Sequence, residues 1–455
     1  MPQPIPTVSL FDSLIYNLVH VLPFYLQGIF FRNRFWTAVW THVHPDPMAV
    51  KFGSYLRRKY KSTYCYIYML TTKSLLVLDH DGIKRVLDLS PAIYAEAPLK
   101  RNGMAHFQPH AVTISRGAAW QERRRFNEAV LQAGHRVHQY AAHFLGVIRH
   151  EIVSKHRHGG AYQSWEDFED LFERITLQII FGPGVYDTPL AALLTKMMRE
   201  SNRVFALRKS RHFDRFYDQI RLYLTYPPAR SLVSLCTQVP STEATRVPNQ
   251  IPHWIFAMKD TLAANTVRAL ALIVTHAATE ARVREEMAQA DLTSPEGIHS
   301  LQYLTGCVQE AMRLWPSIPI LVRETVITDV LGDTVIPSHT QVLILNTFNH
   351  RDRDTHAFAD TFSPEVWLNS HVNYYFNHLS NGPQVCAGKD LALFIAQAVL
   401  ATLLHHNYYI LEQPALNPNQ PLPHSYNYFC TRFRKVERAL VGMENELTGC
   451  KFCGT

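Results

Sequence analysis

The sequence predicts a mainly α-helical protein with a small β-sheet region. Apolar residues recur at helical spacing in four long stretches, at residues 120–156, 165–182, 253–277 and 301–315. Strand patterns are fewer and shorter, at residues 64–70, 74–79, 325–336 and 341–348. We find no internal repeat and no low-complexity tract. We therefore expect helices around a small sheet, with residues 41–455 forming a single domain.

Composition limits the functions worth considering. With 455 residues, of which 47% are hydrophobic and 18% charged, the chain can bury a large core and is not disordered. The formal charge of +7 comes from scattered Lys and Arg, which suits an anionic partner or a membrane surface only weakly. No nucleic-acid partner is expected. The seven cysteines follow no regular spacing, which argues against a disulfide-stapled secreted domain.

The N-terminal segment, residues 1–40, is the most apolar end of the chain. Its stretch from 9 to 31 is interrupted by Asp12, Asn17, His20 and Pro23, so it falls short of a clean membrane-spanning helix. It also lacks the basic start and the cleavage site of a secretory signal. Two readings stay open, an interfacial helix that anchors the chain to a membrane and a helix packed on the domain.

A cysteine between two glycines is the strongest chemical signal. In "SNGPQVCAGKDLALF", Cys386 precedes a stretch that is apolar on all sides through Leu404, which predicts a buried helix. The positive end of that helix favours a thiolate. Gly382 permits a tight turn, and Gly388 leaves room for something flat against the backbone. A soft, open sulfur ligand suits iron in a macrocycle, whereas the ordinary alternative is a structural cysteine in a helix-capping loop.

These residues resemble the cytochromes P450 over most of the chain. The family's haem loop reads Phe-x-x-Gly-x-Arg-x-Cys-x-Gly, and Gly382, Cys386 and Gly388 fit it, while Leu379 replaces the Phe and Gln384 the Arg. The resemblance implies a P450-like fold in which haem lies between a long distal helix and the cysteine loop, with Cys386 as the axial ligand of the iron.

The family's Glu-x-x-Arg motif is present as Glu310 and Arg313, which share one helix face. An Arg that completes this cluster in the family would fall at Val366, so we expect a pair here, or a cluster completed by another group.

Three further residues resemble those that bind the haem propionates. Trp120 and Arg124 have the family's Trp-x-x-x-Arg spacing on one helix, and Arg323 follows the Glu-x-x-Arg helix in a strand. A basic helix start with a buried Trp is the ordinary alternative for the first two. With Gln384 in the loop, the resemblance implies that Arg124 and Arg323 carry more of the propionate charge.

The long helix at 253–277 is the only candidate for the distal helix, and two alignments with the family's Ala/Gly-Gly-x-Asp/Glu-Thr motif compete. The preferred one uses "LAANT", where Ala263 and its neighbour give a thin wall, Asn265 takes the acid position and Thr266 the alcohol. The other uses "AMKDT", with Asp260 and Thr261 as acid and alcohol. Paired alanines are also simply good helix formers, and Asn265 cannot donate a titrating proton.

The resemblance implies a haem-thiolate monooxygenase of a small lipophilic metabolite, in the style of fungal secondary-metabolism P450s. The expected pocket lining is apolar, comprising Phe256, Ala263, Ile318, Ile320 and Leu321. A P450-like peroxygenase, isomerase or dehydratase that needs no electron donor is the second reading, and a haem-binding protein without turnover is the third.

The expected electron donor is a separate NADPH-dependent P450 reductase, because the chain has no GxGxxG or phosphate-binding glycine loop. The family's usual location, which the apolar N-terminus would suit, is the cytosolic face of the endoplasmic reticulum. A form that stays in the cytoplasm remains an alternative.

Overall fold

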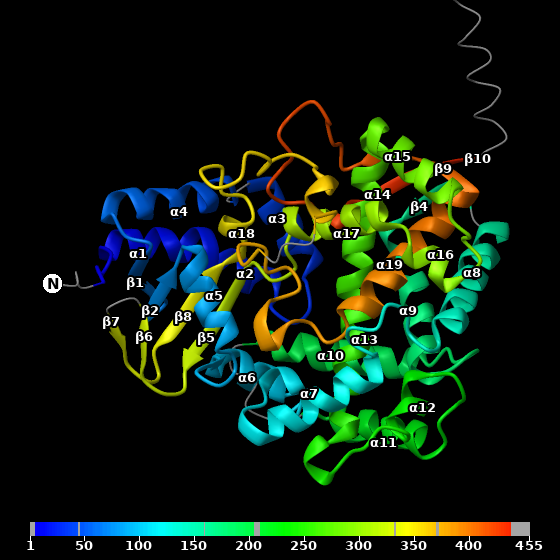
Figure 1. Ribbon diagram of the computed structural model, residues 1–455, viewed down its shortest axis with the longest axis horizontal. Helices are drawn as coiled ribbons and strands as arrows, with labels where there is room; N and C mark the ends of the chain where they lie inside the picture. The colour runs from blue at the N-terminus through cyan, green and yellow to red at the C-terminus, as the bar shows by residue number, and fades with distance from the viewer. Residues whose placement is uncertain are drawn as a thin grey trace, which may run out of the picture.

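The computed structural model describes residues 5–43, 46–158, 160–203, 210–331, 334–369 and 373–437. Helices make up most of the molecule. The largest sheet lies at the end of the molecule that carries the N-terminus (Figure 1). The α-helices are α1 Leu10–Tyr16, α2 Leu22–Gln27, α3 Arg34–Val43, α4 Asp46–Tyr60, α5 His80–Asp88, α6 Pro98–Ala105, α7 Gly117–Leu131, α8 Ala141–His158, α9 Trp165–Phe181, α10 Thr188–Ser201, α11 Phe213–Thr225, α12 Leu232–Cys236, α13 Ile251–Phe256, α14 Ala263–Thr275, α15 Ala277–Ala288, α16 Pro295–His299, α17 Gln302–Leu314, α18 Asn346–Asn349 and α19 Lys389–His406.

The strands form three separate sheets. The largest has the order β1-β2-β8-β5-β3, in which β2 and β8 run parallel and the other neighbours antiparallel. A second sheet has the order β4-β10-β9, and β6 pairs with β7 in a hairpin. The strands are β1 Tyr64–Met69, β2 Thr72–Val77, β3 Tyr94–Glu96, β4 Tyr162–Ser164, β5 Ile320–Thr325, β6 Asp329–Leu331, β7 Thr334–Ile336, β8 Gln341–Leu345, β9 Asn407–Gln413 and β10 Arg432–Glu437. The predicted fold class, mainly helical with a small sheet, is confirmed.

One predicted helix is divided in two. Residues 120–156 form α7 and α8 with a turn between them, because Gln132 and Gly134 adopt positive φ angles of 52° and 78°. A left-handed residue ends an α-helix, and glycine supplies a second one at little cost. The periodic pattern continues across the turn because both helices bury an apolar face, so periodicity alone did not reveal the break.

The central helices enclose the main core. α9, α14, α17 and α19 contribute a large share of its buried apolar side chains, and α14 contacts each of the other three. The predicted distal helix is continuous from 251 to 275, but its middle, Ala257–Leu262, is a π-helical segment η5. A π segment holds more residues per turn than an α-helix and therefore rotates the side chains that follow it.

The N-terminal segment packs on the domain, as one of its two sequence readings expected, and the anchor reading stays a prediction. α1, a π turn at Asn17–Val21 and α2 pack beside β1, burying Asp12, Tyr16 and His20. The opposite face exposes a row of apolar side chains at helical spacing, Leu10, Leu14, Leu18 and Leu22. Among the described residues no single helix is long and apolar enough to span a membrane; one bent pair, Glu243–Thr275 with Ala277–Ala288, passes by length and composition.

Candidate functional site

The loop that carries Cys386 is fixed by its own backbone. The N–H of Cys386 donates to the carbonyl of Leu379 at 2.9 Å, and residues 382–384 form a 3₁₀ turn before it. Gly382 has φ +66°, and a Cβ there would lie 2.4 Å from the carbonyl oxygen of Leu87. Only glycine fits that position, as the sequence argument expected.

Gly388 has a different role from Gly382. A Cβ at Gly388 would make only an ordinary contact with Leu131, at 3.5 Å. The protein's own packing therefore does not require glycine there, and the open space beside the backbone suits a flat group. Helix α19 starts at the next residue, and its side chains from Leu391 to Leu404 are largely buried, as predicted.

The thiol of Cys386 is accessible and yet surrounded by protein. The side chain is exposed, although burial raises its pKa. The backbone N–H of Gly388 and the charge of Arg124 oppose that rise, as the helix-end argument foresaw, but burial is the larger effect. A group that is both reachable and desolvated lies on the wall of an internal space. Burial therefore favours the neutral thiol of Cys386 as long as no cation lies next to the sulfur.

Other groups near this loop and on the distal helix combine accessibility with desolvation. Burial lowers the pKa of His378 to about 3 and that of His253 to about 4, and it raises the pKa of Asp260, while all three keep partial exposure. Several buried polar atoms of the cysteine loop and of the segment before it also have no hydrogen-bond partner: both ring nitrogens of His378, Ser380 Oγ and Gln384 Oε1. The buried Nε atoms of Arg101, Arg116 and Arg323 lack one too.

Buried polar atoms without partners are uncommon in native proteins and point to a missing group. Here they comprise donors and acceptors in the segment that carries the accessible thiol, together with three guanidinium groups elsewhere in the described residues. A large flat cofactor with acidic substituents would satisfy this set. The residues present therefore fit haem.

Arg124 reaches the cysteine loop. Its Nη1 donates to the carbonyl of Val385, the residue before Cys386, at 2.5 Å, and its Nε donates to Glu128 at 2.6 Å. Trp120 lies one turn earlier on α7 and is partly buried. Both side chains thus stand on the helix that lies against the loop, and their bonding to propionates stays a prediction.

Arg323 lies in a cluster of charges that the sequence did not reveal. It is 3% exposed and pairs with Glu96 at 2.9 Å across the β3–β5 ladder. Arg116 pairs with Glu324 at 2.9 Å and donates to the backbone carbonyl of Glu96. Repulsion from Arg116 helps lower the pKa of Arg101, after burial. In the sequence these are ordinary basic residues, and only the sheet brings them together.

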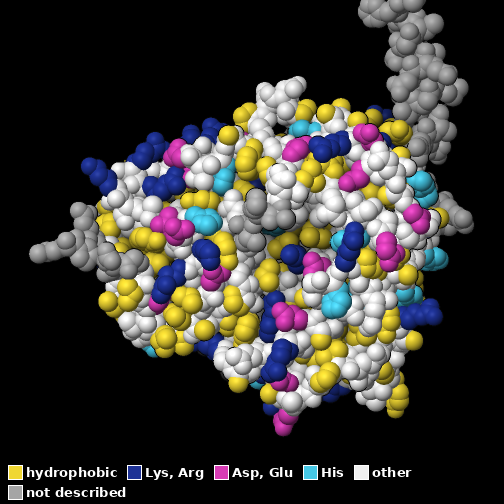
Figure 2. Space-filling model, viewed as in Figure 1, with side chains coloured by type: hydrophobic (Ala, Val, Ile, Leu, Met, Phe, Trp, Pro, Cys, Tyr) yellow, Lys and Arg dark blue, Asp and Glu magenta, His cyan; other side chains and the backbone are white. Residues whose placement is uncertain are grey.

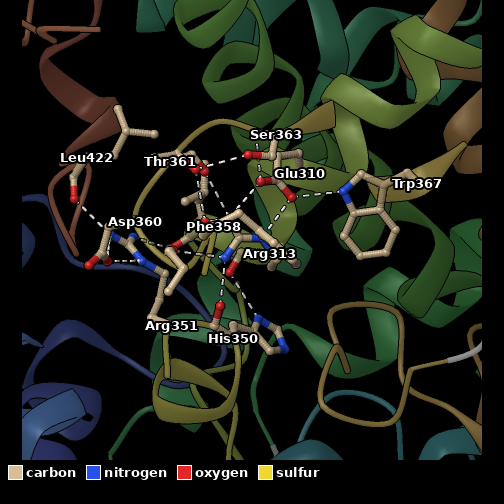
Figure 3. Close-up of polar contacts among 12 residues, drawn as sticks. Glu310, Arg313, His350, Arg351, Phe358, Asp360, Thr361, Ser363, Trp367 and Leu422 are labelled. Atoms are coloured by element: carbon tan, nitrogen blue, oxygen red, sulfur yellow. Dashed lines mark hydrogen bonds and ion pairs between the residues drawn. The ribbon is translucent and has the colours of Figure 1, made fainter. Parts of the chain in front are cut away.

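Glu310 and Arg313 form a fully buried, bidentate ion pair, shown in Figure 3. The guanidinium donates to both carboxylate oxygens, at 2.8 and 2.6 Å, and also to the carbonyls of His350, Phe358, Ala359 and Thr361. Trp367 Nε1 and the backbone N–H of Ser363 complete the coordination of Glu310, at 2.9 and 3.0 Å. The cluster is therefore completed by another group, as one of the two sequence alternatives expected, and Trp367 stands next to Val366.

A second buried ion pair adjoins this cluster (Figure 3). Arg351 bonds Asp360 at 2.6 and 2.9 Å and donates to the carbonyl of Leu422 at 2.7 Å. The ring of His350 bonds the carbonyl of Arg313 on one side and accepts the N–H of Asn377 on the other. The segment before the cysteine loop is thus tied to α17 by paired charges and by backbone hydrogen bonds.

The distal helix presents one accessible face. Its residues are His253, Phe256, Ala257, Asp260, Thr261 and Arg268, and Thr261 is the most exposed of them. By contrast, Thr266 is completely buried and donates to the carbonyl of Leu262 at 2.8 Å. Ala263 and Asn265 are also buried, at 0% and 3% exposure.

The geometry favours the alignment that the sequence argument ranked second, with Asp260 and Thr261 as acid and alcohol. The π segment rotates the helix, so that Ala263 and Thr266 face the core while Thr261 stays reachable. Sequence reasoning chose small residues for the wall and had no means of locating the rotation. Which threonine handles oxygen remains a prediction.

Only some of the residues predicted to line an apolar pocket are accessible. Phe256 is partly exposed and stacks edge-on with Phe107, and Ile318 is 45% exposed. Ile320 and Leu321 instead belong to the two cores on either side of the large sheet, because alternate residues of β5 face opposite sides.

Comparisons with known proteins agree with the site. Residues 241–425 match the family model "Cytochrome P450". The cytochrome P450 monooxygenase fsdH of Fusarium heterosporum is 32% identical over 132 residues, covering 27% of this chain and 23% of that protein. Ferruginol synthase of Salvia pomifera is 32% identical over 147 residues, covering 31% and 32%. The probable cytochrome P450 4d20 of Drosophila melanogaster is 25% identical over 169 residues, covering 35% and 33%.

The alignments thus span between a quarter and a third of the length of these relatives. The residues that match the family model include the distal helix, the Glu310–Arg313 pair and the cysteine loop. Residues 241–425 therefore belong to the cytochrome P450 family, whose cofactor is haem.

Proposed function

We propose that this protein is a haem-thiolate monooxygenase that oxidises a small lipophilic metabolite in natural-product biosynthesis. The observation that carries the proposal is the accessible thiol of Cys386, held on a rigid loop before the buried α19. Bound haem supplies the activation of dioxygen, with electrons from a separate NADPH-dependent reductase. The remaining steps belong to the side chains around it.

On the side of the cysteine loop, the protein holds the sulfur and its charge. The N–H of Gly388 and the guanidinium of Arg124 stabilise negative charge on Cys386, and the bond from Arg124 to Val385 fixes the loop. Arg116, Arg323 and Arg101 form a cluster that would supply cations for acidic substituents of the cofactor. These residues bind and orient the group.

On the distal side, Asp260 and Thr261 are the groups that hold and pass a proton. Burial raises the pKa of Asp260, although Lys259 at 3.2 Å opposes the rise. A carboxyl with a raised pKa carries a proton at a higher pH than an exposed one, which suits a donor. The hydroxyl of Thr261 lies next to it on the accessible face. This pair supplies the titrating acid that Asn265 lacks.

The pair also favours the monooxygenase over the donor-independent alternatives, since delivery of protons to reduced oxygen needs an acid and a relay. Apolar walls support a lipophilic substrate: Phe256 packs against Phe107, and Phe107 against Phe30, with ring centroids 6.0 and 5.9 Å apart.

The proposed function is tested by measuring whether product formation requires NADPH and the reductase. The purified holoenzyme with a microsomal P450 reductase should oxidise NADPH and form product when given candidate lipophilic metabolites. Product formed with hydrogen peroxide alone, at the same rate and without NADPH, would establish the donor-independent alternative. Haem that binds but turns over with neither donor would leave a binding protein.

Membrane contact at the N-terminal end is a further part of the proposal. The exposed leucine row of α1 and α2 continues to Leu70, whose N–H donates to Asn17, and exposed basic residues flank it at Arg58, Lys59, Lys61 and Lys73. Figure 2 shows hydrophobic side chains over the neighbouring β6–β7 hairpin as well. Apolar and basic groups together suit an anionic lipid surface, such as the cytosolic face of the endoplasmic reticulum.

Flotation with vesicles of phosphatidylcholine and phosphatidylserine tests this contact. Replacing Leu14 and Leu18 by Glu should release the protein, whereas the same change at the exposed Leu222 should not. Equal flotation of both variants would remove this surface from the proposal.

A further inference from the structure

Arg268 extends the accessible face of the distal helix beyond the proposed oxygen site. It lies seven residues after Thr261, which places both side chains on the same face, roughly 10 Å apart along the helix axis. Its Nη1 donates to Asn265 Oδ1 at 3.2 Å and to the carbonyl of Trp315 at 2.9 Å. The guanidinium also lies 5.1 Å from the ring centre of Tyr428.

Arg268 has no carboxylate partner within the described ranges. Its Nε is buried and makes no hydrogen bond, and no Asp or Glu oxygen in the part of the chain that the structure describes lies within 4.0 Å of it. Burial lowers its pKa to about 10. An unpaired buried charge is costly. By contrast, the three most buried arginines, Arg313, Arg323 and Arg351, each have a carboxylate partner.

Two acids that act on the neighbouring Tyr428 are engaged elsewhere. Asp260 and Glu169 both act on Tyr428 from a distance. Asp260 pairs with Lys259 at 3.2 Å, and Glu169 pairs with Arg34 at 2.9 Å. Neither is therefore available to neutralise Arg268.

A second arginine lies close by. The Nη2 of Arg32 donates to the carbonyl of Ser317 at 3.1 Å, two residues from the carbonyl that Arg268 binds, and its charge adds to the lowering of the pKa of Arg268. Ser317 also accepts a hydrogen bond from Asn265. Two cations that are 236 positions apart in the sequence thus meet at one loop, which Asn265 also contacts.

We propose that Arg268 and Arg32 bind a carboxylate of the substrate, so that the protein oxidises a lipophilic acid at a carbon remote from its acid group. This inference rests on the proposed function and names the substrate class. A guanidinium presents two parallel donors that match the two oxygens of a carboxylate. In this arrangement the alkyl or ring portion extends along the helix toward Thr261, and the acid group lies about two helical turns away.

Binding, measured by isothermal titration calorimetry of the holoenzyme, tests the inference without turnover. Sodium dodecanoate and dodecan-1-ol form one matched pair of probes, and 4-phenylbutyrate and 4-phenylbutan-1-ol form another. We expect each acid to bind about 10- to 100-fold more tightly than its alcohol, the range for a charge-assisted hydrogen-bonded contact. Arg268→Gln should remove that preference, Arg268→Lys should keep part of it, and Arg221→Gln, at an exposed arginine, should leave it unchanged.

Folding of each variant is checked by circular dichroism and by haem content, and Arg32→Gln provides a second substitution should Arg268→Gln fail to fold. A wild-type protein that binds haem and the alcohols as tightly as the acids overturns this inference alone. An equal preference for acids in wild type and in both glutamine variants also overturns it. Failure to bind haem would instead overturn the proposed function.

Discussion

The Glu310–Arg313 cluster and the accessible face of the distal helix differ in how their buried charges are paired. In the first, Glu310 and Arg313 are fully buried and satisfy each other with help from Trp367. On the second, Arg268 is desolvated without a carboxylate, and burial raises the pKa of Asp260. Buried charges that are paired belong to the framework of the fold. A buried charge that has no partner and is accessible to a ligand indicates a binding site. The contrast separates scaffold from site.

The largest effect is expected at the iron ligand. Cys386→Ala should abolish the red-shifted carbon monoxide band that thiolate ligation gives, and Cys430→Ala, at the other cysteine that is exposed within the described ranges, should keep it. The measurement is the carbon monoxide difference spectrum of the reduced protein. A thiolate band that survives in Cys386→Ala would refute the central assignment.

Breaking the Glu310 pair should cost the most stability. Glu310→Ala leaves Arg313 buried without its carboxylate, and such losses typically cost about 3–5 kcal/mol of unfolding free energy. Trp367→Phe removes one N–H donor and should cost about 1–3 kcal/mol. Urea denaturation measures both. Glu365→Ala, at a half-exposed carboxylate, should stay within about 1 kcal/mol; an equal loss there would show that the buried pair has no special role.

The two alignments of the distal helix differ in which threonine matters. Thr261→Ala should lower product formed per NADPH by about tenfold or more, since it removes the accessible hydroxyl next to Asp260. Thr266→Ala should change coupling little and act on stability, because its hydroxyl bonds the carbonyl of Leu262. The reverse pattern would restore Asn265 and Thr266 as the acid and alcohol positions. Product and NADPH are quantified in the same assay.

Removing the unpaired arginine should not destabilise the ligand-free protein. Arg268→Met deletes a buried charge without orphaning a carboxylate and should raise the unfolding free energy by about 1 kcal/mol or leave it unchanged. Arg351→Met, which strands Asp360, should lower it instead. Thermal unfolding of the two variants distinguishes them, and similar losses would mean that Arg268 is structural.

The smallest effects are expected in the dependence of stability on pH. The pKa of Asp360 is lowered: burial would raise it, but Arg351 and Arg353 more than compensate. Its stabilisation is therefore present above the unfolded pKa of about 3.9 and is lost as pH falls toward the folded value. Asp360→Asn should flatten that acid limb.

Asp260 should behave with the opposite sign. Its folded pKa is raised, so the folded state holds the extra proton and stability falls as pH rises from about 3.9 through the folded pKa. Asp260→Asn should remove this decline. Denaturant titrations between about pH 3 and pH 7 compare the two variants, and equal slopes would contradict the contrast between scaffold and site.

The sequence by itself determined the fold class, the cysteine loop and the Glu-x-x-Arg pair. Each is a local pattern: helical periodicity, a glycine that must adopt positive φ at 382, and two residues three apart on one helix face. Such patterns can be read from the sequence because the interactions that require them join residues only a few positions apart.

Only the tertiary structure decided which side of the distal helix is reachable and which charges meet. The rotation at Ala257–Leu262 depends on packing around the helix, and it moves Ala263 and Thr266 into the core. Trp367 completes the cluster at Glu310 from 57 positions away, and Arg32 approaches Arg268 from the N-terminal segment. Long-range pairing follows from how helices and sheets pack against one another, and no local pattern records it.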